Sequence, residues 1–141
     1  MKIAIINGPN LNLLGKRETD IYGNQPFEEY LEHLQKEFPQ VEFTYTQSNI
    51  EGELVTLLQQ YGFNQDGIIL NPAAYTHTSV AIGDAIAAIP APLVEVHISN
   101  IFSREEFRKL SYVSAKAKGV ISGLGLTGYD LAIRYLLSSL K

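Results

Sequence analysis

The sequence predicts an α/β protein built on a five-stranded parallel sheet with helices on both faces. Short apolar runs typical of buried strands recur along the chain, and segments with helical spacing lie between them. The strand-like runs cover residues 2–7, 41–47, 67–71, 93–97 and 119–122. Strands that alternate with helices indicate a parallel sheet, because parallel neighbours need a long crossover connection, usually a helix.

Two amphipathic segments predict the first helices. The first apolar face consists of Phe27, Tyr30, Leu31, Leu34 and Phe38, and the second of Leu54, Leu57, Leu58 and Tyr61. Each set falls on one side of a helix, so we interpret both as core faces rather than binding stripes.

Three further helices are predicted at about 79–89, 104–110 and 128–140. The second of these has a possible capping box, Ser103 and Glu106, whose side chains can satisfy free backbone N–H groups at a helix start.

The crossover rule orders these elements. Right-handed crossovers place helices on both faces of the sheet, and a flavodoxin-like strand order, 2-1-3-4-5, fits the alternation best. No linker or repeat interrupts the chain, so residues 1–141 are expected to form a single domain. In such a sheet, ligands bind at the carboxyl ends of the strands, near the point where the strand order reverses.

The composition excludes several classes of function. The 141 residues carry a net charge of -4, with 18% charged residues, which leaves no basic field for nucleic acid. No apolar run approaches the ~20 residues of a membrane span, and the N-terminal residues run into a strand without a cleavage site. We therefore expect a cytoplasmic protein that binds no membrane. With no cysteine and 3 histidines, a metal site is disfavoured.

One glycine motif, Gly123-Leu124-Gly125-Leu126-Thr127-Gly128, matches the dinucleotide fingerprint in letters only. That fingerprint needs a βαβ unit with an acidic residue ~20 positions further on, and the chain has none there. We interpret the motif as a close turn between strand and helix, in which glycine supplies positive φ or tight packing.

Glu95 and His97 lie two apart on the predicted fourth strand, so their side chains point to the same face. A carboxylate there can orient the imidazole and favour its protonated form, which predicts a general acid. The turn after it, with the backbone of Ile98 and the hydroxyl of Ser99, is typical of a carboxylate cradle. Arg108 is expected to reach the same anion.

Arg104 is interpreted instead as a solvated surface charge. His77 stands in a run of hydroxyl residues at a helix start, which suits a polyhydroxylated ligand and also suits helix capping by Thr78 or Ser79. Asp84 lies two helical turns further on, and substrate binding, pairing with a neighbour and simple exposure all stay open for it.

The long connection from Asn7 to Gly23 is the remaining feature without a structural reason. Connections above ~12–15 residues without secondary structure are usually functional lids or disordered. Arg17 and Tyr22 lie in it and can fold over a ligand. A tyrosine base at neutral pH needs a stabilised phenolate, because the free phenol ionises near pH ~10, and a nearby guanidinium supplies that stabilisation.

Five polar motifs follow one another along the chain. They read Asn7-Gly8-Pro9-Asn10-Leu11-Asn12, Arg17-Glu18-x-x-x-Tyr22-Gly23, Thr76-His77-Thr78-Ser79, Glu95-Val96-His97-Ile98-Ser99-Asn100 and Arg104-Glu105-Glu106-Phe107-Arg108. In order, spacing and chain length they resemble type II 3-dehydroquinate dehydratase. The resemblance covers essentially the whole chain, and five co-linear motifs are far more specific than any one of them.

The resemblance implies loss of water from 3-dehydroquinate to give 3-dehydroshikimate, in the shikimate route to aromatic compounds. It implies anti elimination through an enolate, without metal or cofactor. Tyr22 would be the base that takes the C2 proton, with Arg17 beside it to stabilise its charged form. His97 would protonate the departing C1 hydroxyl, oriented by Glu95. Asn10 would help to stabilise the enolate by holding a water.

The resemblance also implies how the substrate and the subunits are held. The substrate's hydroxyls and carboxylate would contact Asn71, His77, Ile98, Ser99 and Arg108. Asp84 matches a residue that reaches the site of a neighbouring subunit, in a family that forms dodecamers built from trimers. We therefore expect a homo-oligomer.

The chain departs from the family pattern at three places. Thr19 stands where a proline is usual, Pro72-Ala73-Ala74-Tyr75 replaces a glycine-rich version, and Gly83 replaces a frequent arginine. The first concerns the order of the loop and the last concerns subunit contacts. None of them removes a group with a chemical role.

Two other functions compete with this one. A flavodoxin-like module for a mononucleotide or phosphate ligand would need a loop rich in Ser, Thr and Gly after the first strand, and Pro9 and Leu11 fit that poorly. An enzyme of the same fold with an imine mechanism would need a lysine, for which only Lys16 is well placed.

Overall fold

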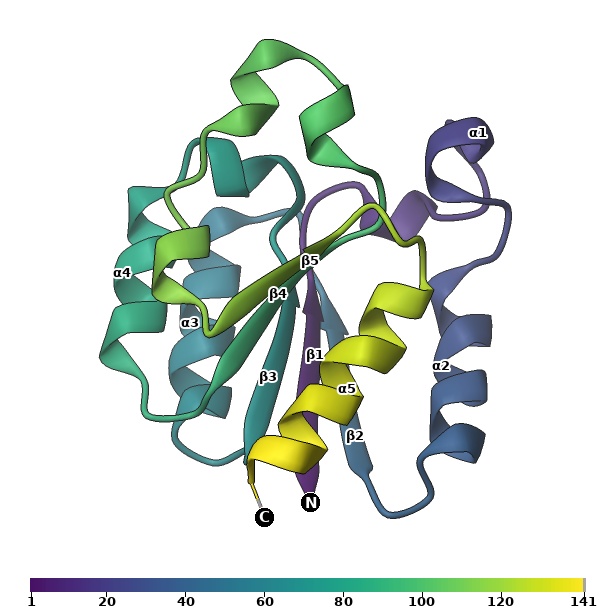
Figure 1. The fold of residues 1–141 in the computed structure, drawn as a ribbon. Coiled ribbons are helices and arrows are strands. Elements are labelled where there is room, and N and C mark those ends of the chain that lie inside the picture. Colours follow the sequence, from purple (N-terminus) through teal and green to yellow (C-terminus); the bar gives the residue numbers. More distant parts are fainter. Residues whose placement is uncertain (141) are drawn as a thin grey trace.

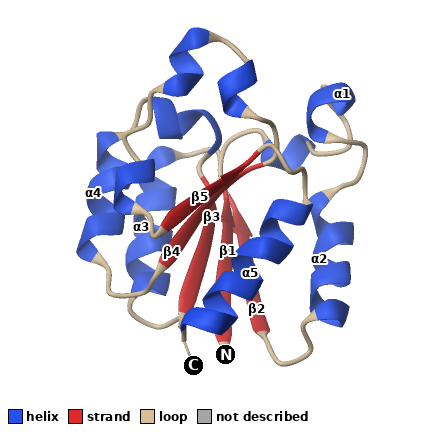
Figure 2. Ribbon diagram, viewed as in Figure 1, coloured by secondary structure: helices blue, strands red, loops and turns tan. Residues whose placement is uncertain are grey.

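The computed structural model describes residues 1–140 as a parallel sheet between two layers of helices (Figure 1). The strands are β1 (Lys2–Asn7), β2 (Glu42–Gln47), β3 (Gly67–Asn71), β4 (Leu93–His97) and β5 (Gly119–Ser122). The α-helices are α1 (Thr19–Tyr22), α2 (Phe27–Glu37), α3 (Glu51–Gly62), α4 (Val80–Ala88) and α5 (Thr127–Ser139). Figure 2 shows that short helical turns gather around one end of the sheet, opposite the two chain termini.

All five strands are parallel and lie in the order β2-β1-β3-β4-β5. This confirms the predicted fold class and strand order. After β1 the chain moves outward to β2 and then returns across β1 to β3, so the strand order reverses between β1 and β3. At such a reversal the connections leave the sheet in opposite directions, which opens a crevice at the carboxyl ends.

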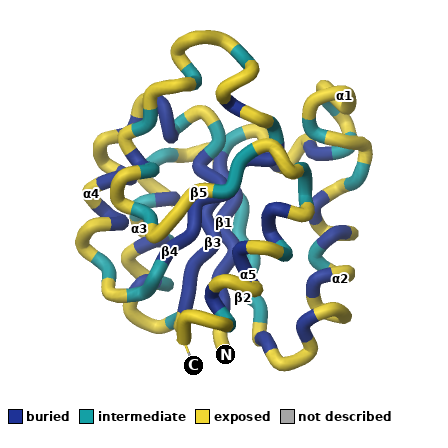
Figure 3. Tube along the Cα trace, in the orientation of Figure 1, coloured by how far each residue is buried: buried dark blue, intermediate teal, exposed yellow. Residues whose placement is uncertain are grey.

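The core has two layers because successive side chains of a strand point to opposite faces. In β1, Ile3 and Ile5 pack with apolar residues of α2 and α5, while Ala4 and Ile6 pack with α3 and α4. The central strands β1, β3 and β4 are buried along their length, and β5 is largely exposed (Figure 3). The predicted helical faces do line this core: Phe27 and Leu34 on one side and Leu54 and Leu58 on the other are at most 1% exposed.

The predicted helix over residues 104–110 is wrong. The chain forms only the short 3-10 helix η4 (Glu106–Lys109), and Arg104 before it has an extended backbone. Phe107 and Leu110 are 59% and 53% exposed, so this segment has no apolar face to bury. A helix of two turns without tertiary packing is not stable in water, because its nucleation is unfavourable.

The capping box predicted for that helix does not form either. The Ser103 hydroxyl donates to the carbonyl of Asn100, 2.9 Å away, and no side chain caps the start of η4.

The connection from β1 to α2 is more ordered than the sequence indicated. It contains the 3-10 helix η1 (Leu11–Leu13) and the single turn α1, and it is anchored by Leu11 and Leu14, which are both 4% exposed. Only the part around α1 projects from the body of the protein (Figure 1).

The glycine motif after β5 forms the close turn between strand and helix that the sequence predicted. Gly123 and Gly125 both have positive φ, +89° and +62°. The amide of Gly123 donates to the carbonyl of His97 and that of Gly125 to the carbonyl of Ile98, at 3.2 and 3.0 Å. The turn therefore supports the chain just after β4. Within residues 1–140, no helix combines the length and apolarity needed to cross a membrane.

Candidate active site

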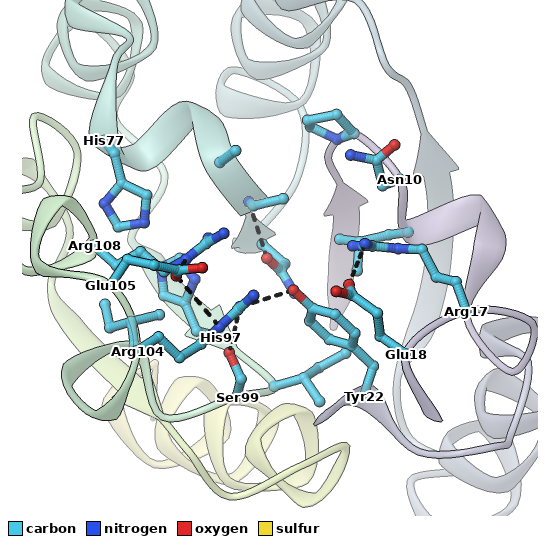
Figure 4. Close-up of a pocket in the computed structure, with 17 residues that line it drawn as sticks. Asn10, Arg17, Glu18, Tyr22, His77, His97, Ser99, Arg104, Glu105 and Arg108 are labelled. Atoms are coloured by element: carbon cyan, nitrogen blue, oxygen red, sulfur yellow. Dashed lines mark hydrogen bonds and ion pairs between the residues drawn. The ribbon is translucent and has the colours of Figure 1, made fainter. Parts of the chain in front are cut away.

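A cavity of about 200 Å³ opens at the carboxyl ends of the central strands, next to the reversal of strand order (Figure 4). The amide of Gly8, just after β1, donates to the carbonyl of Asn71 at 2.7 Å, which joins two of the connections around it. The structure brings most of the predicted site residues into this cavity: Asn10, Arg17, Tyr22, Asn71, His77, His97, Ile98, Ser99 and Arg108.

One side of the cavity is formed by a buried pair of residues on β4. Glu95 and His97 project to the same face, and His97 Nε2 lies 2.5 Å from Glu95 Oε2. Glu95 is inaccessible to solvent and His97 is 5% exposed. Burial alone would raise the pKa of the Glu95 carboxyl, but the hydrogen bond and charge of His97, together with the hydroxyls of Ser114 and Thr76, hold that pKa below its ordinary value. Glu95 is therefore ionised, and it orients the imidazole as predicted.

Tyr22, the last residue of α1, lines the opposite side of the cavity. Its hydroxyl accepts a hydrogen bond from Arg104 Nη1 at 2.8 Å, and the same nitrogen donates to the Ser99 hydroxyl at 3.2 Å. The interpretation of Arg104 as a solvated surface charge is therefore wrong. Because the segment is extended instead of helical, the Arg104 side chain turns into the cavity, where it is only 15% exposed.

Arg17 lies beside Tyr22 in a different way. Its guanidinium carbon stands 4.7 Å from the centre of the Tyr22 ring, over the ring and not at the hydroxyl. Arg17 Nη1 is paired with Glu18 Oε2 at 2.5 Å. Two guanidinium groups therefore surround this phenol, one on its oxygen and one on its ring.

Polar groups at the other end of the cavity suit a carboxylate and hydroxyls. Arg108 is 19% exposed and its Nε lies 2.5 Å from Glu105 Oε2. His77 Nδ1 donates to the carbonyl of Leu110 at 2.6 Å, which leaves Nε2 as the nitrogen that can accept from a ligand. Burial lowers the pKa of His77, against the opposing effect of the Leu110 carbonyl, so the imidazole is neutral at pH 7.

The two asparagines of the cavity differ in how much of their side chain the fold already uses. Asn71 donates to the Tyr129 hydroxyl at 3.1 Å and accepts from the amide of Ala73 at 3.1 Å. Each of its polar atoms keeps one further bonding position for a ligand. Asn10 is exposed, and its backbone amide is fixed by Asn49 Oδ1 at 3.0 Å.

Comparison with known proteins agrees with this geometry. Residues 1–137 match the family model described as dehydroquinase class II. The chain belongs to the class II dehydroquinase family.

Relatives across this family are similar over nearly their full length. A 3-dehydroquinate dehydratase of Fusobacterium nucleatum is 52% identical over 143 aligned residues, covering 97% of each chain. One from Aliarcobacter butzleri is 51% identical and covers 100% of this chain and 87% of its own. The crystal structure of the type II dehydroquinase from Butyrivibrio crossotus superposes with a TM-score of 0.93 at 46% identity, covering 97% of both chains.

Two predicted site residues do not line the cavity. Glu95 is buried behind His97, and Asp84 lies exposed on α4 in this single chain. The preceding Gly83, which departs from the pattern of the class II dehydroquinases, has a local explanation. A Cβ atom at Gly83 would overlap the carbonyl oxygen of Tyr112, so the glycine allows residues 110–114 to lie directly against α4.

Backbone strain concentrates around the cavity. Within residues 1–140, the residues other than glycine that have positive φ are Asn10 at 69°, Glu18 at 41° and Ala73 at 51°, and all three line the cavity. For Ala73 this explains why the family usually has a glycine-rich segment here, because a side chain with Cβ is disfavoured in the left-handed region. The positive φ of Glu18 also suits Thr19, because a proline at position 19 would restrict Glu18 to extended conformations.

Three charged cavity residues were not predicted, namely Arg104, Glu18 and Glu105. A signal for all three was present, because each stands in one of the five motifs of the dehydroquinase pattern. The motifs alone gave none of the three a role. The residues 1–140 contain no cluster of three His, Asp or Glu side chains arranged to hold a metal ion.

Ala73 offers a test of the strain. Changing Ala73→Gly should raise the free energy of unfolding by about 0.5 kcal/mol, because relief of ~1–2 kcal/mol of left-handed strain exceeds the greater freedom of glycine in the unfolded chain, ~0.4–1 kcal/mol. Urea unfolding measures the change. Ala74→Gly is the matched control, since Ala74 lies outside the left-handed region, and it should lower stability by ~0.5–1 kcal/mol. Equal losses in both variants would contradict the assignment of strain to Ala73.

Proposed function

We propose that the protein catalyses the reaction after which its family is named, the loss of water from 3-dehydroquinate to give 3-dehydroshikimate. This is a hydro-lyase step in the shikimate route to chorismate and the aromatic amino acids. One observation carries the proposal: a single cavity is lined by a phenol held between guanidinium groups and by an imidazole held by a buried carboxylate. A base and an acid from different elements can act on opposite faces of a ring, as anti elimination requires.

The base step falls to Tyr22. As the phenolate it takes the proton from C2 of the substrate, next to the C3 ketone, and the electron pair of the broken C–H bond moves to the ketone oxygen to give an enolate. Arg104 stabilises the phenolate through a hydrogen bond to its oxygen, and Arg17 through its position over the ring. The developing enolate oxygen needs fixed donors, and Asn10 at the cavity wall is placed to hold a water against it.

The acid step falls to His97. When the enolate returns to the ketone, the C1–O bond breaks and a double bond forms between C1 and C2. His97 gives its proton to the departing hydroxyl, which leaves as water. Glu95 stabilises the imidazolium form before this transfer and fixes the ring nitrogen Nε2, so that Nδ1 is the nitrogen available to the substrate.

The rest of the cavity accounts for substrate binding. The backbone at Ile98 and Ser99 and the guanidinium of Arg108 provide donors for the carboxylate. His77 Nε2 accepts from a ring hydroxyl because its Nδ1 proton is already used, and Asn71 offers one remaining donor and acceptor position.

The competing functions lose support. A mononucleotide-binding module is not favoured, because the chain belongs to a family of dehydroquinases over residues 1–137. The imine mechanism lacks its residue, since Lys16 is exposed and does not line the cavity. The cytoplasmic location expected from the sequence stays a prediction.

Activity is tested directly by adding 3-dehydroquinate and following the enone absorbance of the product. The parent protein should show turnover. Tyr22→Phe should lower kcat by ~10²–10⁴, because it removes the group that accepts the proton, and His97→Ala should lower it by a similar factor. No turnover in the parent would refute the function, and a fully active Tyr22→Phe would refute the mechanism.

The two arginines near Tyr22 are expected to differ. Arg104→Ala should lower kcat ~10–100-fold, since a charge-assisted hydrogen bond to the phenolate is worth ~1.5–3 kcal/mol. Arg17→Ala should lower kcat less, since Arg17 contacts the ring and not the phenol oxygen. Arg134→Ala is the control, because Arg134 pairs with Glu37 on the outer surface. A larger loss of kcat in Arg17→Ala than in Arg104→Ala would reverse the assignment.

For the assembly, we propose the dodecamer of trimers implied by the family resemblance, with Asp84 reaching a neighbouring site. Asp84 is exposed on α4 and lies outside the cavity of its own chain, and both observations support this assembly. Sedimentation velocity should show a species about twelve times the 15.6 kDa chain mass. A monomer at micromolar concentration would contradict the proposal.

A further inference from the structure

Three hydroxyl groups surround the carboxylate behind His97. Thr76 Oγ1 donates to Glu95 Oε2 at 2.7 Å, and Ser114 Oγ donates to Glu95 Oε1 at 2.6 Å. Ser111 Oγ stands between them, 2.7 Å from the Thr76 oxygen and 2.9 Å from the Ser114 oxygen. Thr76 and Glu95 are inaccessible to solvent, whereas Ser111 and Ser114 are half-buried at the outer side of the cluster. None of the three hydroxyl residues lines the cavity.

The protons in this cluster can be assigned by counting donors. Ser111 Oγ accepts hydrogen bonds from the backbone amides of Val113 and Ser114, at 3.0 and 2.9 Å, which uses both of its lone pairs. Its single proton is therefore left for Thr76 Oγ1, 2.7 Å away. The Thr76 and Ser114 hydroxyls in turn give their single protons to Glu95. The hydrogen bonds thus run in one direction, from backbone amides through Ser111 to the carboxylate.

This direction fixes the state of the acid pair. Glu95 accepts from Thr76, Ser114 and His97, and no partner around it needs a proton from it. A carboxylate that accepts several hydrogen bonds is favoured over its protonated form. Because both carboxylate oxygens of Glu95 act as acceptors, Glu95 can only accept a hydrogen bond from His97. His97 must therefore carry a proton on Nε2, and this hydrogen bond fixes the orientation of the imidazole ring.

The fold places the cluster by holding residues 110–114 on both sides. The amide of Tyr112 donates to the carbonyl of Thr76 at 2.8 Å, and His77 Nδ1 donates to the carbonyl of Leu110 at 2.6 Å. On the other side, Gly83 lets the Tyr112 carbonyl lie against α4. Serines at 111 and 114 therefore reach a carboxylate that belongs to a strand far away in the sequence.

We propose that Thr76, Ser111 and Ser114 are positioning residues that hold Glu95 as an ionised acceptor and thereby fix the orientation of the His97 imidazole for the acid step. The proposal rests on the proposed dehydratase function for its kinetic consequence, and on the geometry alone for its effect on the Glu95–His97 pair. It predicts a loss in kcat with little change in KM, because these side chains touch no part of the cavity.

Other charged groups act on the same pair and must be separated from the cluster. His97 shares the strand with Glu95, and His77 faces the pair from the end of the neighbouring 3-10 helix η2 (Ala73–His77). Arg108 acts on His77 from η4. A change at Ser114 leaves all three in place. A shift in the pH response of a Ser114 variant therefore reports on Glu95 through the lost hydroxyl.

The test compares Ser114→Ala with the parent at several pH values. Loss of one donor to a buried carboxylate should lower kcat about tenfold and move the acid limb of the kcat profile up by about one pH unit, since Glu95 then takes a proton more readily. KM should change less than twofold. Ser114→Thr keeps the hydroxyl and should restore most of the activity. Ser138→Ala is the control, because the Ser138 hydroxyl bonds only the Tyr135 carbonyl on the surface of α5.

A second readout does not depend on turnover. The low-field proton resonance of the N–H between His97 and Glu95 should shift in Ser114→Ala and stay in place in Ser138→Ala. If Ser114→Ala does not fold, Thr76→Val removes the other donor at nearly constant volume and is expected to act in the same direction. An unmoved resonance with an unmoved acid limb overturns the proposal. An inactive parent whose resonance still shifts overturns the dehydratase function and leaves the positioning role of the cluster supported.

Discussion

A carboxylate that solvent cannot reach must be surrounded by donors, and the ionised Glu95 at the end of β4 places this requirement on everything near it. One donor is the imidazole two residues along the strand. The others come from η2 and from the segment after η4, so both must lie close to the sheet edge. His77 also belongs to η2, and Arg108 lies in η4 directly before the second segment, and both side chains line the cavity. The need to satisfy one buried charge therefore also shapes the place where a ligand can bind.

The fold could be predicted because its determinants are local and repetitive. Each strand corresponds to a short apolar run in the sequence, and α2, α3, α4 and α5 have apolar faces that are buried in the core. The prediction failed at residues 104–110, where the residue types permit a helix but no apolar face packs against the core to stabilise one. The turns η1 and α1 were missed for a related reason. They are too short for any periodicity to be visible.

The site was predictable in its chemistry and less so in its contacts. Glu95 and His97 follow from the two-residue period of a strand, and Tyr22 with Arg17 from a connection that the fold does not require. Arg104 was assigned the wrong environment because its assignment depended on the wrong helix. The hydroxyls of Ser111 and Ser114 carry no sequence signal. Their role appears only when residues distant along the chain are brought together.

The charge distribution of the cavity differs from that of the whole chain. The protein carries a net charge of -4, yet Arg17, Arg104 and Arg108 converge on one opening, and guanidinium groups stay charged at every working pH. The carboxylates paired with two of them, Glu18 and Glu105, belong to side chains that are 46% and 56% exposed. They can swing into solvent when a ligand anion takes their place. An anion approaching from bulk water is thus repelled on average by the protein as a whole. It is drawn in only within a screening distance of ~8 Å of the opening, so capture should depend on the ionic strength of the medium.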